Sequence, residues 1–125
     1  MIKRYEGTGR MSRVVEHKDT LYLCGQTCGD AEKNIKEQTA VVLEKIKNLL
    51  EEYGSDKNHI LSTTIYLKDM SMFDEMNEIW DTWVDEGHEP ARACVESKLA
   101  RDYILVELSV IAAKKWVFKI AYSIE

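Results

Sequence analysis

Proline and glycine are scarce in this sequence of 125 residues, which has one proline, Pro90, and six glycines. Linkers and low-complexity segments are usually rich in these residues, and no such stretch is visible here. Because the length is also that of one domain, we expect a single domain over residues 1–113. Residues 114–125 read as an atypical apolar extension. It could be a further strand, a lid over an exposed patch or an appended segment.

Long apolar runs and an excess of positive charge are also missing. No apolar stretch reaches membrane-spanning length, and the first residues lack the apolar core of a secretory signal, so we expect a cytoplasmic protein. Lysine and arginine number 17 against 22 aspartates and glutamates, which gives a net charge of −5. Without a basic stripe, the sequence argues against a nucleic-acid partner, and we expect no membrane partner either.

Cysteines are few and are not arranged as ligands or as a disulfide framework. There are three, Cys24, Cys28 and Cys94, and the first two have three intervening residues rather than the two of redox and zinc motifs. The three histidines are scattered. We therefore expect no metal site, and we interpret each cysteine as a small buried hydrophobic residue.

Hydrophobic periodicity predicts three strands, a helix, a strand, a helix and two strands. The expected ranges are 2–5, 12–16, 20–24, 31–53, 60–67, 71–87, 91–96 and 103–110. Ser71 followed by Asp74 resembles a capping box at the start of the second helix. This order predicts an α+β layer fold, with one mostly antiparallel sheet and two helices on one face. The face without helices would be open, so we expect the chain to cover it by oligomerising.

An arginine on the first of the last two strands and a glutamate on the next are candidates for a functional site. Arg92 and Glu107 are separated by 107 − 92 = 15 residues, and each is flanked by apolar residues. A guanidinium is shaped to hold a small carboxylate by two hydrogen bonds, and a carboxylate can act as a base or orient water. The alternative is that the two residues only form a salt bridge between neighbouring strands.

Several segments together resemble the RidA/YjgF family of enamine/imine deaminases. The first is Pro-Ala-Arg-Ala-Cys-Val-Glu over residues 90–96, with a glutamate fifteen residues after the arginine. The second is residues 19–26, where Cys-Gly-Gln stands in the place of the family's Ser-Gly-Gln. The third is Thr-Thr-Ile-Tyr-Leu-Lys-Asp over residues 63–69, followed by Phe73 and Asn77. The likeness covers roughly residues 9–113.

This resemblance implies a chorismate-mutase-like fold and a homotrimer with a central barrel and ligand clefts between subunits. It implies hydrolysis of 2-imino or 2-enamino acids, such as 2-aminoacrylate, to a 2-keto acid and ammonia, without a cofactor. Arg92 would hold the substrate carboxylate and Glu107 would orient water. The backbone around Cys94 would help to hold that water, Gly25 would form the cleft wall, and Asn77 would be a further substrate contact.

Two cleft positions depart from the family pattern. Met11 stands where the family often has tyrosine, and Cys24 stands where it has serine. We expect both residues in the cleft, but two hydroxyl groups are lost. The sequence therefore leaves open a trimeric binding or regulatory protein that holds small carboxylate metabolites without turnover. A nuclease or translation inhibitor, a role claimed for some relatives, is disfavoured by the acidic composition.

Overall fold

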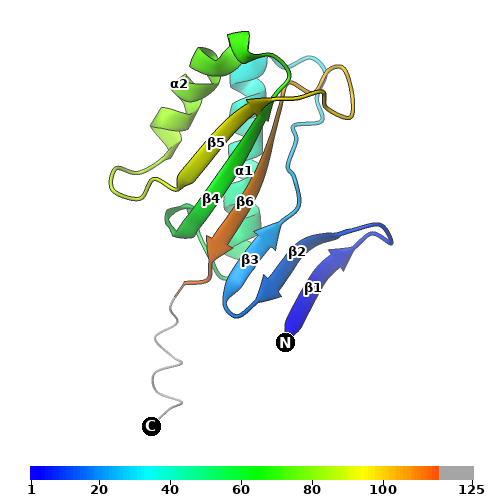
Figure 1. Cartoon of the computed structure of the whole chain (residues 1–125), viewed down its shortest axis with the longest axis vertical. Coiled ribbons are helices and arrows are strands. Elements are labelled where there is room, and N and C mark those ends of the chain that lie inside the picture. Colours follow the sequence, from blue (N-terminus) through cyan, green and yellow to red (C-terminus); the bar gives the residue numbers. More distant parts are fainter. Residues whose placement is uncertain (116–125) are drawn as a thin grey trace.

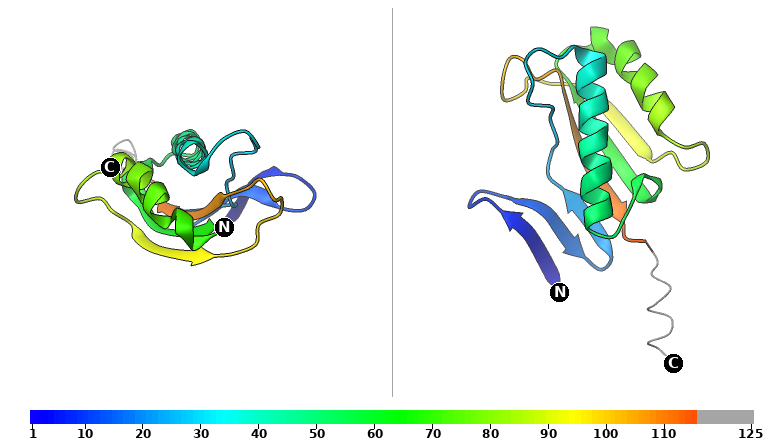
Figure 2. Two further views of the ribbon diagram at one scale, coloured as in Figure 1. Left: turned by 90° about the horizontal axis from the view of Figure 1, so that it is seen from above. Right: turned by 180° about the vertical axis from the view of Figure 1, so that it is seen from behind.

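A six-stranded sheet with two helices on one face forms the part of the chain that the computed structural model describes, residues 1–115 (Figures 1 and 2). This confirms the predicted α+β layer architecture. The strands run in the spatial order β1-β2-β3-β6-β4-β5. The elements are β1 (Ile2–Gly7), β2 (Ser12–His17), β3 (Thr20–Leu23), α1 (Ile35–Glu52), β4 (Ile60–Leu67), α2 (Phe73–Trp83), β5 (Ala91–Glu96) and β6 (Val106–Ala113).

Helix α1 begins where the sequence supplies a complete capping box. The Asn34 side chain accepts a hydrogen bond from the Glu37 N–H at 2.9 Å, and the Glu37 carboxylate accepts one from the Asn34 N–H at 3.0 Å. Two donors that the first turn leaves without intrahelical partners are thus satisfied. The buried stripe of α1 then lies on the sheet, with Val42, Ile46 and Leu50 fully buried.

Strand β4 lies in the sheet between the two strands that carry the candidate residues. It pairs parallel to β5 and antiparallel to β6. The alternative interpretation, a salt bridge between neighbouring strands, required the last two strands to be adjacent, and they are not. Consecutive strands pair in most proteins, but the connection from β5 to β6 here crosses over β4. A direct strand-to-strand salt bridge between Arg92 and Glu107 is excluded by this order.

The hydrophobic core lies between the sheet and the helices. Along β6, Val106, Leu108 and Val110 are buried against the helices, and the intervening residues point to the other side of the sheet. We call this other side the open face. It carries apolar side chains that are exposed in the single chain, among them Tyr22 and Val95, which are 42% and 44% exposed.

The start of α2 differs from the predicted Ser71–Asp74 capping box. The Asp69 carboxylate accepts a hydrogen bond from the Ser71 N–H at 2.8 Å and caps a short 3₁₀ turn over Met70–Met72. Helix α2 begins only at Phe73, and its N-cap, Met72, makes no side-chain hydrogen bond. The acidic cap therefore belongs to the preceding turn, and the helix continues from that turn.

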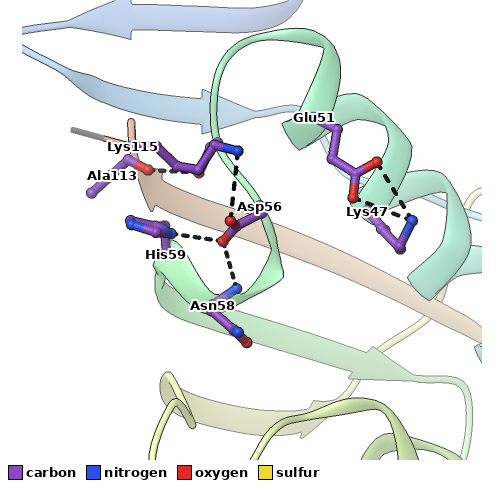
Figure 3. Close-up of polar contacts among 8 residues, drawn as sticks. Lys47, Glu51, Asp56, Asn58, His59, Ala113 and Lys115 are labelled. Atoms are coloured by element: carbon purple, nitrogen blue, oxygen red, sulfur yellow. Dashed lines mark hydrogen bonds and ion pairs between the residues drawn. The ribbon is translucent and has the colours of Figure 1, made fainter. Parts of the chain in front are cut away.

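The end of β6 is fixed by polar contacts from the segment after α1 (Figure 3). Asp56 lies 2.7 Å from the His59 ring nitrogen Nδ1 and 3.9 Å from the Lys115 ammonium group. Burial alone would raise the pKa of Asp56, but the hydrogen bonds from His59 and the Asn58 N–H, together with the charge of Lys115, outweigh it and lower the pKa. The apolar extension expected over residues 114–125 falls mostly outside the described residues.

Candidate functional site

Arg92 is held on the helix side of the sheet by three residues of α2. Its Nη1 donates a hydrogen bond of 2.7 Å to the Asn77 side-chain oxygen. Its guanidinium carbon lies 5.3 Å from the Trp80 ring centre and 5.8 Å from that of Phe73. Within residues 1–115 the guanidinium forms no salt bridge, and the residue is exposed. The Arg92 guanidinium is therefore oriented by α2, while its other N–H donors are available to an anion.

Cys94 lies two residues farther along β5, on the same face as Arg92. The shared face confirms the expected alternation. Burial raises the pKa of the Cys94 thiol, and the nearby charge of Arg92 offsets this only in part. The thiol is therefore protonated at neutral pH and is a poor nucleophile.

Glu107 lies on the open face against the backbone of Gly25. A Cβ placed on Gly25 would lie 2.9 Å from the Glu107 carboxyl carbon and closer still to Oε2. Only glycine leaves room for the carboxylate in this position. On its other side Glu107 is paired with Tyr66 of β4 in the ladder. The half-buried carboxylate is thus confined between a strand and a loop.

The loop that carries Gly25 is itself locked to β6 next to Glu107. The Gln26 N–H donates to the Leu108 carbonyl at 2.9 Å, and the Leu108 N–H donates back to the Gln26 carbonyl at 3.1 Å. The buried Gln26 side chain also donates to the Cys24 carbonyl at 3.1 Å, and its nitrogen lies 3.3 Å from the Cys24 sulfur. Gln26 was not among the predicted site residues, although its position directly after Gly25 could have indicated this role.

Met11 lies in the turn between β1 and β2, where its N–H is bonded to the Thr8 hydroxyl at 3.2 Å. Its side chain is 52% exposed. The adjoining strand β2 connects this turn to the Cys24 loop, since the Cys24 N–H donates to the Arg13 carbonyl at 2.9 Å. Cys24 therefore belongs with the Gly25 loop that lies against Glu107, Met11 lies in the β1–β2 turn, and Asn77 and Cys94 accompany Arg92.

The two candidate residues lie on opposite faces of the sheet in one chain. Thr63 of β4 is paired with Arg92 on one side and with Val110 on the other, so these three share the face covered by the helices. Glu107 is three residues before Val110, and an odd spacing along a strand places it on the open face. One chain therefore carries two separate half-sites. We call Arg92, Asn77 and Cys94 the arginine half-site, and Gly25 and Glu107 the glutamate half-site.

No metal or membrane element accompanies these half-sites in the described part of the chain. Within residues 1–115, no three or more histidine, cysteine, aspartate or glutamate side chains are grouped so that they could hold a metal ion. None of the helices found there combines the length and apolar character that crossing a membrane requires. The side chains of the two half-sites are the Arg92 guanidinium, the Asn77 amide, the Cys94 thiol and the Glu107 carboxylate.

Comparison with known proteins gives consistent matches over nearly the whole chain. A family model described as Endoribonuclease L-PSP matches residues 1–114. A RutC family protein from Haemophilus influenzae is 41% identical over 112 residues, which cover 89% of this chain and 97% of the relative. A crystal structure of a YjgF family member from Neisseria meningitidis has a TM-score of 0.90 and 42% identity, and the match covers 94% of this chain and 98% of that one. A Rid family protein from Yersinia pestis has a TM-score of 0.82 and 29% identity over 90% and 99% of the two chains.

Proposed function

Because this chain belongs to the Endoribonuclease L-PSP family, which includes RutC and YjgF proteins, we propose that it is a cofactor-free deaminase of reactive 2-imino and 2-enamino acids. Family membership by itself supports an enzymatic role in general. The specific reaction is supported by the oriented guanidinium of Arg92, which has donors left for a small carboxylate. This observation carries the proposal, since a carboxylate is the group that all 2-imino acids share.

The proposed chemistry needs only water and two side chains. Water adds to the carbon of the C=N bond, the nitrogen takes up a proton, and ammonia leaves as the C=O bond of the 2-keto acid forms. The Glu107 carboxylate would accept a hydrogen bond from the attacking water and take its proton. Gly25 and the Gln26–Leu108 hydrogen bonds support this role because they leave the carboxylate little freedom.

The proposed site is assembled between subunits of a homotrimer. An arginine half-site and a glutamate half-site on opposite faces of one sheet cannot enclose the same small substrate, so a second chain has to complete each one. The exposed apolar side chains of the open face support such an assembly, because surfaces of this kind mark protein contacts. In this arrangement the open faces would line the central barrel.

Replacement of Arg92 tests the proposal directly. In the presence of an amino acid oxidase that generates the imine, the protein should raise the rate of keto-acid release above the uncatalysed rate. Arg92→Lys keeps the charge but loses the planar fork, so we expect kcat/KM to fall by roughly tenfold or more. The matched control, Arg4→Lys, changes an exposed arginine of β1 and should leave kcat/KM unchanged. Keto-acid release equal to that of the buffer would contradict the proposal.

A binding or regulatory protein for small carboxylates is the second candidate. The specific observation in its favour is that Cys24 and Met11 offer sulfur where the family pattern has hydroxyl groups. This candidate predicts that 2-keto acids raise the melting temperature of the wild type but not of Arg92→Ala, with no imine hydrolysis. Cleavage of RNA that persists in Arg92→Ala would instead favour a nuclease, as the family description suggests.

A further inference from the structure

A cavity of about 360 Å³ lies beyond the end of β4, where the loop between β5 and β6 folds over it. Figure 1 shows this loop at the tip of β5, away from both termini. We call it the basic pocket, and its lining residues are Lys68, Lys98, Leu99, Arg101 and Asp102. Three cations and one carboxylate thus surround a small cavity in a chain whose net charge is −5.

Two of the three cations of the basic pocket, Lys68 and Arg101, are held by main-chain carbonyl groups. The Lys68 ammonium group donates to the Asp102 main-chain carbonyl at 2.5 Å, and Arg101 donates to the Ala100 carbonyl at 2.9 Å. Among the salt bridges of residues 1–115, none joins Lys68, Lys98 or Arg101 to a carboxylate. The pocket therefore keeps a positive potential, which favours an anionic group.

The basic pocket is adjacent to the glutamate half-site along β6. The Lys68 N–H donates to the Leu105 carbonyl at 2.9 Å. This hydrogen bond continues the pairing of β4 with β6, in which Tyr66 is paired with Glu107. Leu105 precedes Glu107 by two residues, a distance of about 7 Å along a strand. Because Lys68 lines the pocket and its backbone lies beside Leu105, a substrate that extends from Glu107 along β6 past Leu105 is directed toward the pocket.

We propose that the basic pocket binds the distal carboxylate of a 2-imino dicarboxylic acid, which makes acidic imino acids the preferred substrate class. This inference rests on the proposed deaminase function. Lys98 and Arg101 supply charge-assisted hydrogen bonds to the carboxylate, and Lys68 forms the wall nearest to β6. The Asp102 carboxylate repels an anion in the pocket and so lowers the affinity for the distal carboxylate. Its replacement by a neutral residue should therefore have the opposite effect to replacement of a cation.

A pair of substrates of equal length tests this selectivity. Oxidation of glutamate and of norvaline generates 2-iminoglutarate and 2-iminopentanoate, which differ in the distal carboxylate. We expect wild type to have the higher kcat/KM for 2-iminoglutarate. Lys98→Gln and Arg101→Gln should each lower the ratio of the two kcat/KM values by about fivefold, and Asp102→Asn should raise it. The value for 2-iminopentanoate should not change, and Lys18→Gln, an exposed lysine elsewhere, should leave the ratio as it is.

The outcomes separate this inference from the function on which it rests. If wild type hydrolyses both imines and the ratio is the same in Lys98→Gln, Arg101→Gln and Asp102→Asn, the basic pocket has no role in selectivity. The deaminase proposal then stands and this inference is wrong. If neither imine is hydrolysed, the deaminase proposal fails. Calorimetry with glutarate then tests whether the basic pocket binds a carboxylate. Weaker binding of glutarate to Lys98→Gln than to wild type supports carboxylate binding by the pocket, and equal or absent binding overturns it.

Discussion

Gly25 allows a residue-scale prediction because the space beside it is occupied by Glu107. A Cβ at this position would meet the carboxyl group, so Gly25→Ala should displace the carboxylate by a substantial fraction of an ångström or more. We expect kcat/KM for imine hydrolysis to fall by roughly tenfold to a hundredfold, with little change in the melting temperature. Steady-state kinetics and thermal denaturation would measure both.

Gly7→Ala is the matched control for this substitution. A Cβ on Gly7 would have no neighbour within 4 Å, so activity should be retained. Neither glycine has the positive φ angle that disfavours alanine, so backbone strain does not enter the comparison. Unchanged kcat/KM in Gly25→Ala would show that the position of the Glu107 carboxylate is not critical.

The residues of the two half-sites could be predicted to different extents. The shared face of Arg92 and Cys94 follows from the two-residue repeat of a strand, and the structure confirms it. The cation–π contacts of Arg92 with Trp80 and Phe73 could not be predicted, since they depend on how α2 crosses β5. The contact between Gly25 and Glu107 likewise brings together residues far apart in sequence, and no local pattern encodes it.

At the scale of elements, a buried glutamine ties α1 to the segment that leads into β6. The Gln38 side chain donates to the Tyr103 carbonyl at 2.9 Å and accepts from the Leu105 N–H at 3.0 Å. Gln38→Met keeps the volume but leaves these two backbone groups without partners. We expect the free energy of unfolding to fall by about 1–3 kcal/mol, measured by urea denaturation.

A substitution on the exposed side of α1 controls for this effect. Glu44 is exposed on the same helix, so Glu44→Met should change stability by less than about 0.5 kcal/mol. Because Leu105 precedes Glu107 by two residues, Gln38→Met should also lower the activity of the folded fraction. A variant as stable as wild type would mean that water or a backbone shift replaces the Gln38 hydrogen bonds.

Most of the helices and strands could be predicted from the local sequence. Strand β4 has the predicted bounds because its β-branched residues fit a strand and its alternate residues are buried. The start of α2 was misplaced because a side-chain cap can serve a preceding turn as well as a helix. The position of β4 between β5 and β6 could not be predicted in this way. Which strands pair depends on the packing of the whole sheet, whereas the sequence of one strand shows only that it is a strand.

For the whole molecule, the separation of the half-sites is the feature with the largest consequence. Arg92 faces α2 and Glu107 faces away from both helices, so the single chain is incomplete with respect to the proposed reaction. The same open face carries Tyr22 and Val95, which are 42% and 44% exposed. Burial of such side chains between chains would favour association by roughly 25 cal/mol for each Å² of apolar surface removed from water.

Mixing two inactive variants tests whether each site is shared between chains. Arg92→Ala and Glu107→Ala should each lose imine hydrolysis. In randomly mixed trimers, a site is complete only if a Glu107→Ala chain supplies Arg92 and a neighbouring Arg92→Ala chain supplies Glu107, which occurs in about one quarter of sites. Co-refolding equal amounts of the two variants should therefore restore about a quarter of wild-type activity, whereas either variant refolded alone should stay inactive. If activity does not return although mass spectrometry shows mixed oligomers, the two residues do not act across a subunit boundary.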